Sequence, residues 1–412
     1  MSQVYLLREG RRVKLPKQPK EIFPNQEEIE TLKDTPVNRI LDILSSALFH
    51  LSNLAIEKEN LRRFVGETGR SEDMIISTFK KVKLLSSREY LKGLLEYQLH
   101  NTEFLDKWLP ITDEVYVHAE PLGKGVNIGA GNSPMSTIIP EVWRSLTKNA
   151  CIHKMPSGDK VTLELLHHVY TSEEKYYPLE RTFIACYWPG GSEDIENPLF
   201  MSSDYVMAWG DDSHVESARR RTPFPVKFLG FGQEYGMALI DDYVMKDEKK
   251  RKEAAYGVAL DVSFGDQMYC TSTQFGFLEK EDENNVKKFL EDLNSSMEDL
   301  RKTLKPGNVE KSIKMDIREE VDTARFSGGL VLGPNNLDYT IIYTETPPKE
   351  LGIFPQHRFL RVYGVENLTQ TVQYANKHMN NVSIATSEST RKYLREEFSK
   401  SCLLYTSPSP RD

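Results

Sequence analysis

The sequence predicts an α/β protein, in which a doubly wound parallel sheet is preceded by a helical N-terminal layer and followed by a second α/β domain. Two observations predict this fold class. Between residues 113 and 242, short apolar segments alternate with helical segments of about ten residues, which is typical of βαβ units. Before them, residues 36–65 carry apolar side chains at the spacing of an amphipathic helix.

Length, composition and charge exclude several classes of protein. The chain has 412 residues, of which 39% are hydrophobic and 28% are charged, so a globular protein of roughly two or three domains is expected. Its net charge of -8 argues against a nucleic-acid partner. The sequence has no apolar run long enough for a membrane span, and its first residues lack the apolar stretch of a secretory signal.

The four cysteines are widely separated and form no CxxC pair; they are Cys151, Cys186, Cys270 and Cys402. This spacing indicates neither a zinc site nor a disulfide framework. It suits a soluble protein of a reducing compartment, the cytoplasm, where one thiol could stay free and reactive. Cys151 and Cys186 fall in predicted buried strands, where a thiol usually serves as a small apolar side chain. We therefore expect no bound metal.

Residues 1–112 are predicted to form an arm and the helical layer. Residues 1–35 are polar and contain several prolines, as expected for an arm over the surface. The helix over 36–65 is followed by two further helical patterns at 71–85 and 87–100. The apolar stripe of the first helix could bind an apolar ligand, but such a stripe more often belongs to a core.

Residues 113–242 are predicted to form the first α/β domain. Strands are expected at 114–132, 150–156, 182–190 and 203–210 and at the short runs VKFLGFG and MALID. Helices are expected between them. In sheets of this kind, ligands bind at the carboxyl ends of the strands.

Residues 243–400 are predicted to form the second α/β domain. Its helices and strands are expected at 284–305, 308–324, 339–344 and 358–364. Residues 401–412 show no periodicity and resemble a non-native tail, in which case Cys402 has no function and this domain is C-terminally truncated. The alternative is a genuine disordered tail.

Cys270 is the candidate nucleophile. It follows a glycine-bounded loop in GDQMYCTSTQ, and a short helix can follow it. A thiol near a helix N-terminus has a lowered pKa, and the thiolate is the nucleophile. Taken alone, a free cysteine is more often a buried apolar side chain, and this alternative stays open here.

The setting of Cys270 resembles the aldehyde dehydrogenase superfamily. The pattern G-x-Q-x-x-C resembles its nucleophile segment. Upstream, GAGNSP resembles its W-N-F-P turn, which places Asn132 on the oxyanion-binding asparagine. TKNACIHKMPSGD resembles the strand with K-P-S-E, which places Lys154 on the cofactor-binding lysine, and YVMAWGDDSHVESARR resembles F-T-G-S-x-x-V-G, which places Gly210 beside the cofactor pyrophosphate. The segments occur in the same order over roughly residues 115–370.

Two positions depart from the superfamily's motifs. Hydrolytic members carry a general-base glutamate in E-L-G-G-K, but the matching position here is Gly230, and Glu234 is out of register. The loss of a water-activating base fits transfer of the acyl group to a thiol rather than to water. The second departure is Arg361 in RVYGV, which replaces the ribose-binding glutamate of E-x-F-G-P.

Within the superfamily, GAGNSP, TKNACIHKMPSGD, the Cys270 segment and HRFLRVYGVENL resemble the acyl-CoA reductase family typified by LuxC of bacterial bioluminescence. The resemblance implies an aldehyde-dehydrogenase-like fold, with a Rossmann-type cofactor domain over 113–242 and a catalytic domain over 243–400. It also implies NADPH-dependent reduction of a long-chain acyl thioester, acyl-CoA or acyl-protein, to a fatty aldehyde through an acyl-cysteine. An acyl-protein synthetase partner and a homo-oligomer are implied as well.

The choice of cofactor depends on Ser157. In K-P-S-E the glutamate accepts from the adenosine ribose and would repel a 2′-phosphate, whereas Ser157 is neutral at that position. Lys154, with Lys160 nearby, would then meet the phosphate without a competing carboxylate. The sequence therefore favours NADPH, with NADH as the alternative.

Other functions stay open. They are an aldehyde dehydrogenase that oxidises aldehyde to acid, a cysteine acyltransferase or thioesterase that needs no nicotinamide, and a non-catalytic subunit with the same fold. The pair His167 and His168 has no third ligand at a suitable spacing for a metal. The run Arg219–Arg221 is expected to end a helix rather than to bind a polyanion.

Overall fold

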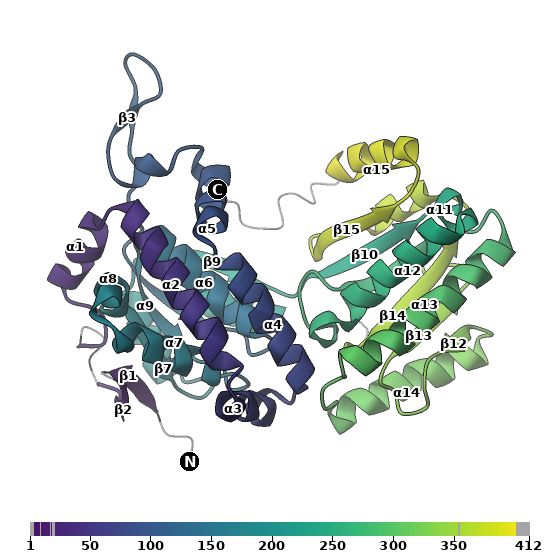
Figure 1. Cartoon of the computed structure of the whole chain (residues 1–412), viewed down its shortest axis with the longest axis horizontal. Helices are drawn as coiled ribbons and strands as arrows, with labels where there is room; N and C mark the ends of the chain where they lie inside the picture. Colours follow the sequence, from purple (N-terminus) through teal and green to yellow (C-terminus); the bar gives the residue numbers. More distant parts are fainter. Residues whose placement is uncertain (1–3, 9, 17, 19–20, 353–354, 401–412) are drawn as a thin grey trace. The chain divides into compact units, whose positions relative to one another are not determined.

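The computed structural model describes residues 4–8, 10–16, 18, 21–352 and 355–400. It divides into two compact units (Figure 1). The first comprises Met1–Thr68 and Ile75–Gly232, and the second comprises Gly69–Met74 and Gln233–Asp412. Residues 401–412, including Cys402, lie outside the described residues.

The first unit is built on a seven-stranded sheet in the order β2-β1-β7-β6-β5-β8-β9. Its parallel strands are β5 (Lys124–Ile128), β6 (Ala150–Lys154), β7 (Phe183–Tyr187), β8 (Tyr205–Trp209) and β9 (Lys227–Phe231). The first parallel strand, β5, lies in the middle of the sheet. The chain then runs outward through β6 and β7 and returns to place β8 on the other side of β5. This reversal makes a topological switch point between β5 and β8, where such sheets bind ligands.

Helices cover both faces of this sheet, which confirms the doubly wound fold. One face packs on α2 (Val37–Ala55), α6 (Pro134–Leu146) and α7 (Val161–Ser172). The other packs on α9 (Glu193–Met201) and α10 (Asp212–Arg221). Consecutive residues of β7 face opposite sides of the sheet: Ala185 belongs to the core on the first face and Cys186 to the core on the second.

The helical layer contains shorter helices than the sequence pattern predicted. Its other helices are α1 (Gln26–Asp34), α3 (Lys58–Thr68), α4 (Glu72–Leu85) and α5 (Arg88–Leu99), whereas the short α8 (Tyr177–Glu180) directly precedes β7. The segment expected as one helix breaks between α2 and α3, where Asn60 Nδ2 donates to the Leu54 carbonyl at 2.9 Å. No single described helix is both long and apolar enough to cross a membrane; α2 and α3 satisfy both conditions only as a pair, which is bent by 82°.

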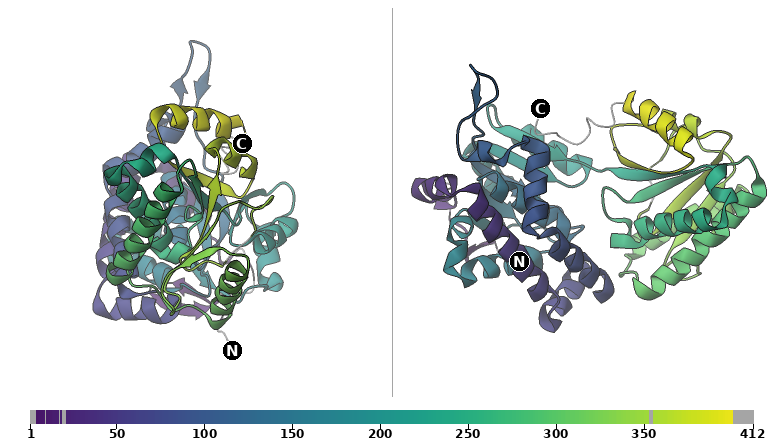
Figure 2. Two further views of the ribbon diagram at one scale, coloured as in Figure 1. Left: turned by 90° about the vertical axis from the view of Figure 1, so that its right-hand side faces the viewer. Right: turned by 45° about the horizontal axis from the view of Figure 1, so that its top comes forward.

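Residues 5–8 and 11–14 do not form the surface arm that we expected. Strands β1 (Tyr5–Arg8) and β2 (Arg11–Lys14) form a hairpin, and β1 pairs with the edge strand β7, with Tyr5 opposite Tyr187. Leu6 is 1% exposed because it closes one of the two cores at this edge. A second hairpin, β3 (Leu109–Pro110) with β4 (Tyr116–Val117), projects from the rest of the unit (Figure 2).

The second unit contains a six-stranded sheet in the order β12-β13-β14-β11-β10-β15. The strands are β10 (Tyr235–Ile240), β11 (Thr273–Glu279), β12 (Leu330–Leu332), β13 (Thr340–Thr344), β14 (Phe359–Val365) and β15 (Met379–Ala385). All pairs are parallel except that of β12 with β13. We expected the first α/β domain to extend to residue 242, but β10 pairs with β11 and β15, so the boundary lies at Gly232–Gln233.

Helices also cover both faces of the second sheet. After the short α11 (Asp242–Lys246), α12 (Glu248–Ser263) and α13 (Glu283–Thr303) lie side by side on one face (Figure 1). The other face packs on α14 (Lys311–Phe326) and α15 (Glu388–Lys400). Because the strands other than β12 are parallel, the loops that precede them lie at one end of the sheet, the amino edge, and the loops that follow them lie at the other, the carboxyl edge. Functional residues can lie at either edge.

Candidate functional site

Three of the predicted residues lie at the carboxyl edge of the first sheet. Asn132 follows β5, Lys154 ends β6, and Gly210 follows β8. Since β5 pairs with β6 on one side and with β8 on the other, these strand ends are neighbours. The residues that the sequence motifs selected therefore gather around the switch point.

The turn that carries Asn132 packs closely on the loop after β6. A Cβ on Gly131 would lie 3.3 Å from the Gly158 nitrogen, and a Cβ on Gly129 would lie 3.4 Å from the Lys154 carbonyl oxygen. The glycines therefore let the two loops approach backbone to backbone. This packing brings Asn132 into the same loop cluster as Lys154 and Ser157.

Helix α6 begins directly after Asn132. Ser133 caps it, with its side chain accepting from the Met135 N–H at 3.1 Å, and Ser136 Oγ donates to the Ala130 carbonyl at 2.8 Å. These bonds fix the turn and orient the first N–H groups of α6 toward the carboxyl edge of the sheet. A helix N-terminus of this length favours an anionic oxygen nearby.

Lys154 is held in a buried setting. The residue is 7% exposed. Burial lowers the pKa of its ammonium group, and the charge of the Glu196 carboxylate opposes that effect. Glu196 accepts from Trp188 Nε1 at 2.9 Å and pairs with Arg221 at 2.8 Å. A desolvated ammonium gains most from oxygen acceptors that a ligand brings, so Lys154 suits a ligand rich in hydroxyl or phosphate groups.

The loop with Ser157 differs from our expectation in one respect. Ser157 is exposed and neutral, as predicted, but Lys160 donates to Glu67 at 2.9 Å through Nζ and at 2.8 Å through its backbone N–H. Glu67, from α3, also accepts from the Val161 N–H at 3.2 Å. A carboxylate therefore does compete for Lys160, and no sequence motif announces it because it comes from the helical layer.

Gly210 leads into α10, whose N-cap is Asp211. Burial alone would raise the pKa of Asp211, but hydrogen bonds from Ser213 and from the backbone and ring of His214 lower it to about 2. Asp212 adds a second carboxylate in the first turn. A pyrophosphate is therefore less favoured at this helix N-terminus than at that of α6, whose first turn has no acidic residue.

Cys270 lies in the second unit, three residues before β11, and the residue is exposed although the surrounding chain partly desolvates its sulfur. We expected a helix after it and a lowered pKa, and the structure corrects both points. Burial by the surrounding chain and the charge of Glu234 raise the pKa of the thiol, against the effect of the Cys270 and Thr271 N–H groups. A thiol of this kind is protonated at neutral pH and needs a base before it can attack.

Glu234 is a candidate functional residue that motif counting set aside as out of register. Gly230 belongs to β9 of the first unit, whereas Glu234 precedes β10 of the second, where Asn380 donates to its carboxylate. Because β10 and β11 are adjacent and parallel, with Gly236 opposite Thr273, residues that precede both strands share one edge. That pairing was the signal that could have found Glu234 beside Cys270.

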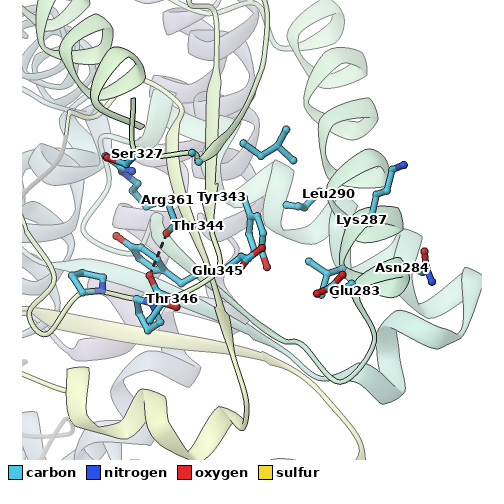
Figure 3. A pocket seen from close by; sticks show the side chains of 17 residues that line it. Glu283, Asn284, Lys287, Leu290, Ser327, Tyr343, Thr344, Glu345, Thr346 and Arg361 are labelled. Carbon is cyan, nitrogen blue, oxygen red and sulfur yellow. Dashed lines mark hydrogen bonds between the residues drawn. The ribbon is translucent and has the colours of Figure 1, made fainter. Parts of the chain in front are cut away.

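A pocket of about 1000 Å³ lies elsewhere in the second unit (Figure 3). It is lined by the first turns of α13, the segment after β13, and Arg361 and Tyr363 of β14. Cys270 and Glu234 are not among its lining residues. Arg361, expected at the ribose-binding position, forms an ion pair with Glu320 of α14 and faces this pocket.

The weaker candidates have structural roles. His167 accepts a hydrogen bond from the Gly10 N–H at 3.1 Å, and burial lowers its pKa to about 4. Arg219 pairs with Glu216 at the end of α10. Cys151 and Cys186 are buried in β6 and β7, as predicted.

The chain has the aldehyde dehydrogenase fold. It is similar to aldehyde dehydrogenase 21 of Physcomitrella patens, with a TM-score of 0.70 and 12% identity over 96% of this chain and 88% of that one. A putative methylmalonate-semialdehyde dehydrogenase of Sinorhizobium meliloti 1021, complexed with NAD, gives a TM-score of 0.71 and 15% identity over 96% and 87%. For the NADP-dependent glyceraldehyde-3-phosphate dehydrogenase of Bacillus halodurans C-125, complexed with NADP, the values are 0.66 and 14% over 96% and 89%.

Within that fold, the chain belongs to the acyl-CoA reductase (LuxC) family, whose model matches residues 32–401. It is 28% identical over 368 residues to the long-chain acyl-protein thioester reductase of Vibrio harveyi, covering 88% of this chain and 75% of the relative. The Photobacterium phosphoreum reductase of the same name is 28% identical over 382 residues, covering 90% and 76%. The family resemblance that the motifs indicated is confirmed.

Proposed function

We propose that this chain reduces a long-chain fatty acyl thioester to the fatty aldehyde, through an acyl intermediate on Cys270 and with NADPH as the hydride donor. The observation that carries the proposal is an exposed cysteine, Cys270, whose thiol pKa is raised by burial of its sulfur and by the charge of the Glu234 carboxylate, in a chain of the acyl-CoA reductase family. The relatives named long-chain acyl-protein thioester reductase support the class of substrate.

The first step forms the acyl-enzyme. Because the pKa of Cys270 is raised, a base must take its proton, and Glu234 is the carboxylate whose charge acts on the thiol. The thiolate attacks the carbonyl carbon of the thioester. The bond from that carbon to the departing sulfur then breaks, and the departing thiolate takes the proton from Glu234. A covalent step of this kind divides one difficult transfer into two easier ones.

Hydrogen-bond donors must hold the oxyanion that forms during this attack. The N–H groups of Cys270 and Thr271 already act on the thiol sulfur, so they lie at the reacting atom. We propose the Asn132 amide as the side-chain donor. One such donor typically lowers the barrier by about 3 kcal/mol.

A nicotinamide cofactor fits the carboxyl edge of the first sheet, because glycine turns, the N-terminus of α6 and a buried lysine meet at its switch point. When bound, the cofactor supplies the hydride that converts the acyl group to aldehyde. Lys154 would bind its ribose or phosphate oxygens, and Gly210 leaves room at the turn after β8. Ser157 supports NADPH because it brings no negative charge, while Glu67 beside Lys160 opposes that preference.

Mass spectrometry of the intact protein tests the proposal. After mixing with a long-chain acyl-CoA in the absence of NADPH, we expect an acyl adduct on Cys270, which disappears when NADPH is added. Titrations with NADPH and NADH measure which cofactor binds more tightly. An adduct that persists in a Cys270→Ala variant would show that the nucleophile is another residue.

Glu234 favours a second candidate function, the oxidation of aldehyde to acid. A carboxylate beside the nucleophile can activate water against an acyl-enzyme. The two functions are distinguished by which substrate drives the change in the nicotinamide. Oxidation of NADPH that depends on acyl-CoA supports the reductase. Aldehyde-dependent reduction of NADP⁺ without CoA, with release of free acid, supports the dehydrogenase.

The acyl donor and the assembly state belong to the same proposal. Acyl-CoA and an acylated carrier protein, supplied by an acyl-protein synthetase, offer the same thioester carbon to Cys270. We also propose a homo-oligomer, because the β3–β4 hairpin exposes large apolar side chains, with Trp108 66% and Tyr116 57% exposed. Sedimentation of the purified chain, alone and with a synthetase, measures both associations.

A further inference from the structure

The loop that leads to Cys270 is strained. Gly265, Asp266 and Gln267 have φ angles of 66°, 52° and 63°. Glycine adopts this left-handed region freely, but Asp266 and Gln267 do so at a cost in free energy. A Cβ on Gly265 would lie 2.6 Å from the ring of Tyr269, so the loop is also tightly packed. Such a conformation persists only where surrounding contacts hold it.

A second strained segment lies against the first. His357 and Arg358, just before β14, have φ angles of 70° and 61°. The His357 N–H donates to the Asp266 carbonyl at 3.2 Å. Two runs of left-handed residues, far apart in the sequence, are therefore bonded to each other at the amino edge of the second sheet, the edge that carries Cys270.

A buried ion pair joins the two segments. Arg358 Nε donates to Asp266 Oδ1 at 2.8 Å, and these residues are 1% and 4% exposed. The other carboxylate oxygen accepts from the Gly307 N–H at 3.1 Å, and Arg358 Nη2 donates to the Leu304 carbonyl at 2.8 Å. Removing one partner would leave the other charge buried without its counterion, which is strongly unfavourable.

The side chain of Gln267 forms hydrogen bonds that hold the chain before and after Cys270. Its Nε2 donates to the Thr273 carbonyl at 2.8 Å and to the Phe359 carbonyl at 2.7 Å, and its Oε1 accepts from the Phe359 N–H at 2.8 Å. Residues 267 and 273 flank Cys270. The chain between them is thus closed into a short loop, anchored to the starts of β11 and β14.

We propose that Asp266 and Arg358 are positioning residues for Cys270: their ion pair holds the strained loop in the one conformation that presents the thiol for attack. The proposal rests on the proposed role of Cys270 as nucleophile. Without the pair, the loop can relax toward ordinary backbone angles, while the ladder between β11 and β14 keeps the sheet intact. The effect should therefore appear in the reactivity of Cys270 and not only in stability.

The test follows the rate at which iodoacetamide alkylates Cys270, located by peptide mass spectrometry, from pH 6 to 10. We expect Asp266→Asn to slow alkylation at its pH plateau, and acylation by a long-chain acyl-CoA, by about tenfold or more. Arg358→Lys retains the charge but loses the donor to Leu304, and should show a smaller decrease. If Asp266→Asn does not fold, Arg358→Lys carries the test.

Asp292→Asn is the matched control. It removes the partner of Arg251 in another ion pair of the second unit, between α12 and α13, at 2.8 Å. It should lower the unfolding temperature and leave the alkylation profile of Cys270 unchanged. A folded Asp266→Asn or Arg358→Lys variant with the wild-type profile and acylation rate would overturn the positioning role. Acylation that persists in Cys270→Ala would instead overturn the proposed nucleophile.

Discussion

The two sheets carry their candidate functional residues at opposite edges. In the first unit, Asn132, Lys154 and Gly210 follow the carboxyl ends of parallel strands, whereas in the second unit Glu234 and Cys270 precede β10 and β11. Helix N-termini meet the carboxyl edge and bring positive partial charge, while helix C-termini meet the amino edge and bring negative partial charge. The first edge therefore suits an anionic cofactor. At the second edge, burial and the charge of Glu234 raise the pKa of the Cys270 thiol.

The two loop clusters also differ in how they are held. The Asn132 turn is a short connection into a capped helix, fixed by hydroxyl groups of Ser133 and Ser136. The Cys270 loop contains left-handed non-glycine residues and is fixed by a buried charge pair. A ligand-binding turn can be built from ordinary helix-capping chemistry, whereas a loop that must present one reactive atom is over-determined by its surroundings.

Replacement of the proposed nucleophile has the largest expected effect and tests the amino edge of the second sheet. Cys270→Ala should lower acyl-CoA-dependent NADPH oxidation by about 10³-fold or more, because no other residue replaces a covalent nucleophile. Its unfolding temperature should hardly change, since the residue is exposed and the substitution removes a single sulfur atom. Steady-state kinetics and differential scanning calorimetry measure the two quantities. Residual turnover near the wild-type rate would place the chemistry elsewhere.

Asn132→Ala tests the carboxyl edge of the first sheet. Loss of one oxyanion donor should reduce kcat by about 10²-fold to 10³-fold, with a smaller change in KM. Ser133→Ala is the matched control, because Ser133 directly follows Asn132 and its side chain caps the N-terminus of α6. That variant should lose about 1 kcal/mol of stability with little change in kcat. Equal effects of the two variants on kcat would mean that Asn132 acts only through the helix.

The gathering of residues at the carboxyl edge of the first sheet could be predicted from the sequence, and that at the amino edge of the second sheet only in part. Asn132, Lys154 and Gly210 stand in local motifs at strand ends, so the order of strands suffices to bring them together. Glu234 and Glu67 carry no motif, because each reaches its partner through tertiary packing, Glu234 across neighbouring strands and Glu67 from the helical layer. The hairpin of β1 and β2 was missed for the same reason: its apolar residues become a core only against β7.

Glu234→Gln sharpens the comparison by changing the charge at the amino edge alone. The Glu234 carboxylate raises the pKa of Cys270, so its removal should lower that pKa and increase the thiolate fraction at neutral pH. Alkylation by iodoacetamide should then rise at lower pH than in the wild type. If Glu234 also takes the thiol proton during catalysis, acylation should fall by roughly 10²-fold in the same variant. Faster alkylation together with undiminished acylation would leave Glu234 an electrostatic role only.

Glu67→Gln has the smallest expected effect and concerns cofactor choice at the carboxyl edge. Glu67 neutralises Lys160 through a partly exposed ion pair at 2.9 Å, and pairs of this kind are worth up to about 1 kcal/mol. Once Lys160 is released, the affinity for NADPH should rise by up to roughly fivefold relative to NADH. Fluorescence titration with both cofactors measures this ratio without turnover. Glu164→Gln, on the neighbouring helix α7 and paired with Arg12 and Arg63, is the control that should leave the ratio unchanged. If Glu67→Gln instead weakens NADH alone, the carboxylate itself binds the ribose, and the helical layer supplies the group that the loop with Ser157 lacks.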